Sequence, residues 1–351
     1  MAVRTEPLPG TVVRFPHLSP DGRFLTFMDE NPKLIRIMDL ASGMVRELSP
    51  GDARRAAWSA DGRYLHVPGE EIDTIYGPGL DIALSFPHTT TWGWAADGPW
   101  LTVEEPDQSV ALRPVEGNGA PVPLFSALPA EVKPLVINGK GPSLGTRWEK
   151  GRPRWDLVQV ERPGEAAQAV ASEYTDLAAA PNGRAWVLWH KGRLALHPDG
   201  EAPLELIPPG RYSWYNGAWS PDSKWVALIG ATLNKKEVLL FSADGVRKSL
   251  ELGSFERLAE MGEADQPIRW MPDSQSFAFV TFATFPAEWR NANWVHLVDV
   301  ASGGERVWRL PYSAYTQQDS RGLGTLRNFQ FVDDHTLLAT LGDTLYRYEL
   351  R

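Results

Sequence analysis

The chain has 351 residues, 43% of them hydrophobic, and a formal net charge of −9. It has no cysteine, which excludes disulfides and thiolate zinc sites, and its acidic balance argues against nucleic-acid binding, because phosphate contacts need a basic face. No apolar run reaches the length of a signal peptide or a membrane span, so we expect a cytoplasmic protein without a membrane partner. The excess of arginine over lysine, with 29 prolines, resembles the composition of thermophile proteins.

In chain order, similar stretches return around an aspartate or asparagine: HLSPDGRFLTF at 17–27, WSADGRYLHV at 58–67, WAADGPWLTV at 94–103 and WSPDSKWVALI at 219–229. The marker positions are Asp21, Asp61, Asp97, Asn138, Asn182, Asp222, Asp273 and Asp334. Successive markers are 36 to 44 residues apart, except for two longer intervals of 51 and 61 residues at the C-terminal end. A fixed period of this length indicates a repeat architecture.

Each repeat is predicted to begin with a strand, a turn and a second strand. Apolar residues lie three positions before and four positions after the marker in every unit but the one around Asn138, which matches least well. Alternation continues to the sixth position, with Phe27, Val67 and Val103 as examples, and this period of two is typical of a strand. Aspartate followed by glycine supplies the turn between the two strands.

Several repeats continue with a second hairpin. LIRIMDLASGMVREL at 34–48 and WVHLVDVASGGERVWRL at 294–310 share its turn, and VLLFSADGVRKSLEL at 238–252 is a looser relative. Four short antiparallel strands every 40 or so residues are typical of a propeller blade. The sequence therefore predicts an all-β protein, a single propeller of eight four-stranded blades, with seven blades as the alternative if the Asn138 unit is not a blade.

The last repeat has only three strands before the chain ends, whereas the first residues have no partner of their own. We expect residues 1–10 to supply the missing strand and close the ring, which leaves no sheet edge open. The single domain 1–351 then divides into approximate blades at 11–50, 51–88, 89–126, 127–170, 171–208, 209–255, 256–312 and 313–351.

The Ser-Pro-Asp-Gly-Arg-Phe turn and the following Asp-Leu-Ala-Ser-Gly hairpin resemble the WD40-like (PD40) repeats of TolB-type propellers. The same repeats are found in the propeller domains of prolyl-oligopeptidase-like peptidases. The resemblance covers most of the chain and implies the fold, but such propellers serve in partner binding, substrate gating and catalysis alike. The chain lacks the α/β-hydrolase domain of those peptidases, so their activity does not carry over.

Motifs that suggest chemistry have simpler interpretations. GPSLG at 141–145 fits the nucleophile-elbow pattern around Ser143, but that motif needs a strand-to-helix turn, so we interpret it as a hairpin. The seven histidines show no metal-ligand spacing, and we expect neither a metal nor a cofactor. The repeated tryptophans Trp58, Trp94, Trp219 and Trp270 are interpreted as packing residues between blades. The basic run RWEKGRPRW at 147–155 is interpreted as a solvated hairpin tip.

The longer intervals predict loop insertions at 253–267, 284–293 and 312–325. In a propeller, connections between blades and turns between second and third strands emerge on the same face, so these insertions are expected to cluster. Their arginine and aromatic side chains are typical of interface hot spots. The predicted partner-binding residues are Arg257, Glu260, Trp289, Arg290, Tyr312, Tyr315 and Arg321.

The favoured function is that of a non-catalytic binding or scaffold protein that recognises a protein or peptide through this face. The alternative is a hydrolase or lactonase-like enzyme with a site in the central channel.

Overall fold

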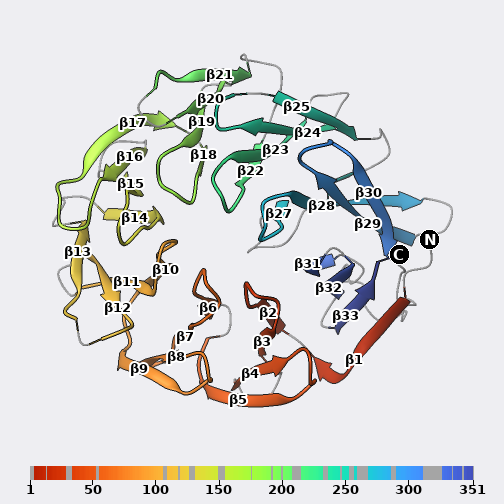
Figure 1. The fold of residues 1–351 in the computed structure, drawn as a ribbon, viewed down its shortest axis with the longest axis horizontal. Coiled ribbons are helices and arrows are strands. Elements are labelled where there is room, and N and C mark those ends of the chain that lie inside the picture. Colours follow the sequence, from red (N-terminus) through yellow and green to blue (C-terminus); the bar gives the residue numbers. More distant parts are fainter. Residues whose placement is uncertain are drawn as a thin grey trace.

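A computed structural model describes the protein over residues 4–12, 14–28, 34–52, 55–105, 109–117, 119–125, 131–148, 155–174, 176–190, 193–198, 201–207, 215–231, 236–245, 247–252, 257–258, 268–285, 290–310, 326–333, 335–341 and 344–350. In these ranges, antiparallel strands form eight sheets arranged around a common centre (Figure 1). Seven sheets have four strands, and one has five. The predicted eight-bladed all-β propeller is confirmed. No helix in the described ranges is long and apolar enough to span a membrane.

In blades one to seven the strands run in chain order from the centre outward, and in blade eight the N-terminal strand is outermost (Figure 1). Blade one comprises β2 (Arg14–Leu18), β3 (Phe24–Met28), β4 (Leu34–Asp39) and β5 (Val45–Pro50). Blade two comprises β6 (Ala57–Trp58), β7 (Leu65–Val67), β8 (Ile72–Tyr76) and β9 (Ile82–Pro87). Blade three comprises β10 (Thr91–Trp94), β11 (Trp100–Glu104), β12 (Val110–Pro114) and β13 (Val122–Phe125). Blade four comprises β14 (Glu131–Val136), β15 (Ser143–Trp148), β16 (Trp155–Val160) and β17 (Gln168–Tyr174).

The second half of the ring follows the same plan. Blade five comprises β18 (Asp176–Ala179), β19 (Trp186–His190), β20 (Arg193–His197) and β21 (Leu204–Ile207). Blade six comprises β22 (Tyr215–Trp219), β23 (Trp225–Ala231), β24 (Lys236–Ser242) and β25 (Arg247–Leu252). Blade seven comprises β26 (Arg257–Leu258), β27 (Ile268–Trp270), β28 (Ser276–Phe285), β29 (Arg290–Asp299) and β30 (Glu305–Leu310). Blade eight comprises β31 (Leu326–Asp333), β32 (Thr336–Leu341), β33 (Thr344–Glu349) and β1 (Arg4–Val12).

The segment around Asn138, which matches the repeat least well, forms the complete four-stranded blade four, so the seven-bladed alternative is wrong. Its first turn spans residues 137–142, between the end of β14 and the start of β15, and is one residue longer than the equivalent turn 19–23 of blade one. Blade four also ends later than expected, because β17 continues to Tyr174, past the anticipated boundary at 170.

The hydrophobic core is divided among the junctions between blades. The described residues contain eight clusters of buried apolar side chains, and each cluster combines two consecutive blades around the ring. Between blades five and six, for example, Leu196 packs with Trp219 and Phe241. Second strands are covered on both sides, so Phe27 and its neighbour Thr26 are both buried. Because burial of apolar surface drives folding, each blade depends on both of its neighbours.

Blade one and blade eight meet at the point where the ring closes. The N-terminal strand β1 pairs with β33 in antiparallel register, with Arg4 opposite Glu349 and Pro7 opposite Tyr346. In the same junction Phe27 and Met38 of blade one pack with Leu338 of blade eight. The predicted pairing between the N-terminal segment and the C-terminal blade is observed, and β1 extends to Val12, two residues beyond the expected end at 10.

The first turn of a repeat has the same hydrogen bonds in several blades. In blade one the Ser19 hydroxyl donates to Asp21 Oδ1 (2.5 Å) and accepts the Phe24 N–H (2.8 Å). The same arrangement recurs around Ser59 of blade two and Ser220 of blade six. Gly22 has a φ of 71°, a left-handed conformation that glycine adopts without strain. The repeated Asp-Gly pair is thus explained by the geometry of the turn.

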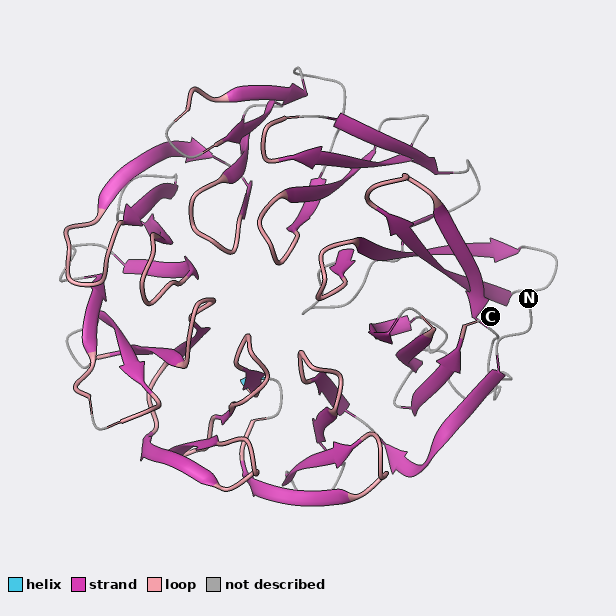
Figure 2. Ribbon diagram, in the orientation of Figure 1, coloured by secondary structure: helices cyan, strands magenta, loops and turns pink. Residues whose placement is uncertain are grey.

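These first turns also contact one another. The Asn182 N–H of blade five donates to Ser223 Oγ of blade six (3.0 Å), and the Asp222 N–H donates to Ser274 Oγ of blade seven (3.1 Å). In blade four the Lys140 N–H donates to Asp97 Oδ2 of blade three (2.8 Å). Figure 2 shows the turns as loops gathered around the centre of the ring. Hydrogen bonds between blades therefore hold this face together.

The repeated tryptophans link neighbouring blades, as predicted. The indole N–H of Trp94 donates to the Ala57 carbonyl (2.8 Å), that of Trp219 to the Ala178 carbonyl (3.0 Å), and that of Trp270 to the Ala218 carbonyl (2.9 Å). In each case the acceptor belongs to the first strand of the preceding blade. Trp58 instead stacks on Phe24, with 5.9 Å between ring centroids, and its buried indole nitrogen has no described hydrogen-bond partner.

Blade seven differs most from the other blades. Strands β28 and β29 have ten residues each, whereas the second and third strands of the other blades have three to seven. Pairing continues to the end, where Phe285 lies opposite Arg290. The expected loop at 284–293 is therefore mostly strand, which corrects that prediction. The expected insertion at 253–267 also contributes a strand, since β26 pairs with β28 (Arg257 opposite Phe282).

Candidate functional site

The structure describes two of the seven predicted partner-binding residues. The backbones of Arg257 and Arg290 lie in β26 and β29, on either side of β28, opposite Phe282 and Phe285 respectively. They therefore belong to one sheet, three residues apart along the same central strand. The other five residues lie outside the described residues and stay predictions: Glu260, Trp289, Tyr312, Tyr315 and Arg321.

The part of blade seven that exceeds the length of the other blades will be called the blade-seven extension; it comprises Arg257–Leu258, residues 281–285 and residues 290–293. It lies at the end of β28 that leads into β29, away from the first turns. Its strands are paired through the backbone, so the extension is an ordered ribbon rather than a loop. Functional residues on paired strands are positioned more precisely than residues on loops.

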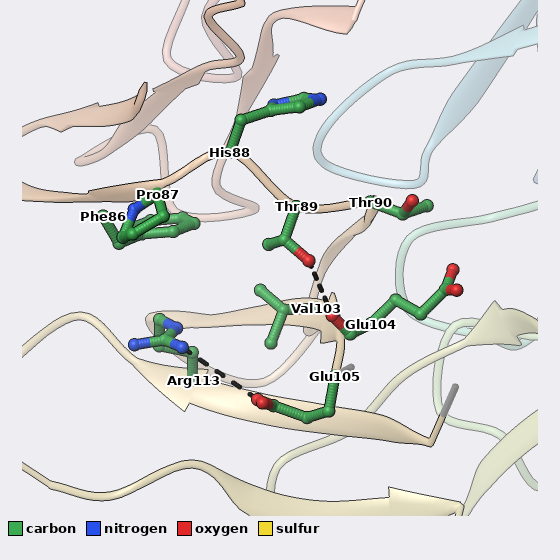
Figure 3. A pocket seen from close by; sticks show the side chains of 9 residues that line it. All are labelled: Phe86, Pro87, His88, Thr89, Thr90, Val103, Glu104, Glu105 and Arg113. Carbon is green, nitrogen blue, oxygen red and sulfur yellow. Dashed lines mark hydrogen bonds and ion pairs between the residues drawn. The ribbon is translucent and has the colours of Figure 1, made fainter. Parts of the chain in front are cut away.

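A second candidate lies between blades two and three. A hollow of about 470 Å³ is lined by Phe86, Pro87, His88, Thr89, Thr90, Val103, Glu104, Glu105 and Arg113, and will be called the His88 pocket (Figure 3). Residues 88–90 connect the outer strand of blade two to the inner strand of blade three, and Glu104 ends the second strand of blade three. The pocket is therefore on the same face as the blade-seven extension.

His88 is held in place by a buried carboxylate. Its Nδ1 lies 2.7 Å from Asp73 Oδ1, and the other oxygen of Asp73 lies 3.3 Å from Nε2 of the buried His66. Burial raises the pKa of Asp73, but the nearby His66 imidazole and the hydrogen bonds from His88 and from the Gly69 N–H outweigh this effect and hold the pKa below its ordinary value. Asp73 is therefore a carboxylate at neutral pH.

An ionised carboxylate only accepts hydrogen bonds, so Nδ1 of His88 carries the proton that it donates to Asp73. When the imidazole is neutral, Nε2 is left as a hydrogen-bond acceptor. The same contact ties the connection between blades two and three to the third strand of blade two, together with the hydrogen bond from the His88 N–H to the Glu71 carbonyl (2.7 Å). Asp73 thus fixes both the ring orientation and the path of the chain.

The charges at the other end of the pocket are partly balanced. The Arg113 guanidinium lies 5.0 Å from the centroid of the Phe86 ring, and its Nη2 is 4.0 Å from Glu105 Oε1. Figure 3 shows this pair below the His88 and Thr89 backbone. Thr89 Oγ1 donates to the Glu104 carbonyl (2.6 Å), and the Glu104 N–H donates to the Thr90 carbonyl (2.8 Å). No described residue pairs with the Glu104 carboxylate.

Other motifs have structural roles. Ser143 is fully buried, and its hydroxyl accepts the Asn138 N–H (2.9 Å) and donates to the Asn138 carbonyl (3.2 Å). The GPSLG stretch thus belongs to a hairpin, as interpreted from the sequence, with its first two residues in the turn and its last three in β15. Arg147, at the start of the basic run, forms an ion pair with Asp156 (3.1 Å). The described part of the chain holds no group of three or more histidine and carboxylate side chains arranged to bind a metal ion.

The sequence did not point to the His88 pocket. His88 was considered only as one of seven histidines without metal-ligand spacing, and Asp73 and Arg113 belong to no motif. The clue available in the sequence is positional. His88 directly follows a fourth strand and Asp73 lies at the start of the third strand of the same repeat, so both are near one face of the blade.

No family model and no curated protein sequence matches the chain. Its fold is similar to that of solved propellers. The WD40 domain of SCAP from fission yeast has a TM-score of 0.59 at 10% identity, over 99% of this chain and 98% of that one. The Dos1 propeller has a TM-score of 0.58 at 11% identity, over 99% of this chain and 93% of that one.

A third similar structure is the dihydro-heme d1 dehydrogenase NirN, solved in complex with DHE, with a TM-score of 0.52 at 18% identity over 84% of this chain and 65% of that one. WD40 domains and a dehydrogenase are thus both among the similar structures. At these identities the likeness shows a WD40-like propeller fold, and membership of the TolB-type family stays a prediction.

Proposed function

We propose that the protein is a non-catalytic binding propeller that recognises a protein or peptide partner on the face that carries the blade-seven extension. The observation that carries the proposal is the extension itself. Seven blades keep second and third strands of three to seven residues, and one blade departs from this plan with ten-residue strands and an additional paired strand.

The described clusters at the two junctions of blade seven are made by the regular parts of its strands, with Phe279 toward blade six and Leu297 toward blade eight. The side chains expected on and beside the extension are arginine, tryptophan and tyrosine, the types that contribute most at protein interfaces. The neighbouring propellers support the proposal through their fold alone. A hydrolase with a site in the central channel stays the alternative prediction.

The test is capture of a partner by the full-length protein. Wild-type protein immobilised through a C-terminal tag is used to capture proteins from a lysate of the native organism, and the captured protein is identified and then expressed for a binding measurement. The double variant Trp289→Ala/Tyr315→Ala should lower the affinity for that purified protein by at least about 30-fold, because hot-spot truncations cost about 2 kcal/mol or more.

The matched control is the double variant Arg63→Ala/Lys224→Ala, which removes two exposed side chains from first turns on the opposite face. It should bind the partner as the wild type does. If the control loses binding and Trp289→Ala/Tyr315→Ala keeps it, the extended face is not the site. A stoichiometric divalent ion in the purified protein, lost on chelation together with a hydrolytic activity, would favour the enzyme alternative instead.

A further inference from the structure

Two serines in the first turns adopt a backbone conformation that residues other than glycine rarely take. Ser223 of blade six and Ser274 of blade seven both have a φ of 62°, in the left-handed region. The equivalent residue of blades one, two and five is a glycine, with a φ of 68° to 71°. This conformation is strained for serine and unstrained for glycine, so a favourable interaction of the serine side chain has to offset the strain.

That interaction is a hydrogen bond with the preceding blade. Ser223 Oγ accepts the Asn182 N–H of blade five (3.0 Å), and Ser274 Oγ accepts the Asp222 N–H of blade six (3.1 Å). Ser223 is only 6% exposed and Ser274 only 4%, so water competes little for these hydrogen bonds. Glycine at this position has no hydroxyl and cannot accept the same hydrogen bond.

The same two junctions also contain the tryptophan hydrogen bond. The indole N–H of Trp219 donates to blade five, and that of Trp270 donates to blade six. The junction between blades one and two is the contrast, because Gly62 replaces the serine there and the Trp58 indole nitrogen has no described partner. Blades five to seven are therefore joined by two side-chain hydrogen bonds at each junction, in addition to their apolar packing.

We propose that Ser223 and Ser274 hold blades five, six and seven together as a rigid arc, and that serine occupies the left-handed position because its hydroxyl makes this contact. Blade seven bears the blade-seven extension, so the arc is the scaffold on which the extension is built. The first turn of blade one has no such contact with blade two and opens more readily. The inference does not depend on the proposed function.

Native-state hydrogen exchange at the amides of Asp21 and Asp222 tests the proposal in the full-length protein. Each aspartate follows a serine and a proline in the sequence, so the intrinsic exchange rates of the two amides are closely matched. The Asp222 N–H is bonded to Ser274, whereas the Asp21 nitrogen lies beside Gly62. We expect Asp222 to exchange at least about fivefold more slowly than Asp21, since one hydrogen bond shifts a local opening equilibrium by about this factor.

Two reciprocal variants move the hydroxyl. Ser274→Gly removes the acceptor and should speed exchange at Asp222 by at least about fivefold, with exchange at Asp21 unchanged. Gly62→Ser adds a hydroxyl at the equivalent place and should slow exchange at Asp21 by a similar factor. A serine fits there, because a Cβ at Gly62 would lie 3.5 Å from the Asp21 nitrogen and no closer to any other atom. An unchanged rate at Asp222 in Ser274→Gly, or at Asp21 in Gly62→Ser, would overturn the inference.

Melting curves separate the hydrogen bond from the backbone strain. Ser274→Ala loses the hydroxyl and keeps the strain, whereas Ser274→Gly loses both. The glycine variant should melt close to the wild type, and the alanine variant should melt lower than the glycine variant by about 1–2 °C. Equal melting temperatures of the two variants would show that the left-handed conformation costs nothing at this position, and would contradict the argument that the serine is there for its hydroxyl.

Discussion

The two faces of the propeller differ in how they are held together. On the face of the first turns, the serine and aspartate hydrogen bonds recur in several blades, and backbone N–H groups donate to side chains of adjacent turns, as from Asn182 to Ser223. On the opposite face, the connections differ from blade to blade: one holds the His88 pocket, and another bears the blade-seven extension. Substitutions in the first turns would break hydrogen bonds that the repeat requires. The repeat does not determine the residues of the opposite connections, so these residues can differ in order to bind a ligand or partner.

The largest effect is expected where the ring closes. Deletion of Met1–Pro7 removes the pairing of Arg4 to Pro7 with β33 and exposes an unpaired strand edge. We expect the melting temperature to fall by about 10 °C or more, because the loss of several backbone hydrogen bonds removes several kcal/mol. Alanine at Arg4 and Glu6 is the control, since it keeps the backbone ladder and should barely change the melting curve. An unchanged melting temperature in the deletion variant would refute this role of β1.

The next largest effect is expected at the junction between blades one and eight. Phe27 is fully buried there, in contact with the cluster that includes Leu338. Phe27→Ala should lower the free energy of unfolding by about 3–5 kcal/mol through lost burial and the cavity left behind. Denaturant titration measures this value. A loss below about 1 kcal/mol would mean that this junction does not hold the ring closed.

The third prediction concerns Asp73, which holds the connection between blades two and three on the face opposite the first turns. Asp73→Asn removes the charge from the hydrogen bond with His88 and from the contact with His66, and should cost about 2 kcal/mol of stability at about pH 7. The folded pKa of Asp73 lies below its ordinary value, so its contribution to stability is present above the unfolded pKa and is lost as the pH falls through the folded pKa.

The difference in unfolding free energy between wild type and Asp73→Asn should therefore shrink as the pH is lowered from about 4, near the unfolded pKa, through the lower folded pKa. The comparison of the two proteins at each pH cancels the titration of the other carboxylates. A difference that stays constant over this range would show that the charge of Asp73 is not what ties His88 in place.

The fold was predictable because the same position carries the same type of residue in each repeat. Trp94, Trp219 and Trp270 occupy one position of the repeat and make the same hydrogen bond to the preceding blade. The need for a tryptophan at that position is therefore visible three times in the sequence. Aspartate and glycine at the first turn repeat for the same reason. Such repetition makes a weak local signal strong.

The His88 pocket was not predictable in this way. Asp73 and His88 are 15 residues apart in blade two, and Glu104 and Arg113 belong to blade three, so no period relates them. Their meeting depends on how residues 88–90 cross from one blade to the next.

The position of the blade-seven extension was predicted, but its strand conformation was not. That prediction rested on the lengths of the intervals between repeats, and a longer interval does not distinguish a longer pair of strands from a longer loop.

The smallest effect compares two tryptophans at the same repeat position. The indole N–H of Trp219 donates to the Ala178 carbonyl, whereas the buried indole nitrogen of Trp58 has no described partner. Phenylalanine at either site removes similar surface, but only Trp219→Phe also breaks a hydrogen bond and leaves a carbonyl of the preceding blade without that donor. We expect Trp219→Phe to cost about 1 kcal/mol more than Trp58→Phe in denaturant titrations. Equal losses would mean that the hydrogen bonds between blades add nothing to the packing of the indole rings, and that the repeated tryptophan is kept for its size alone.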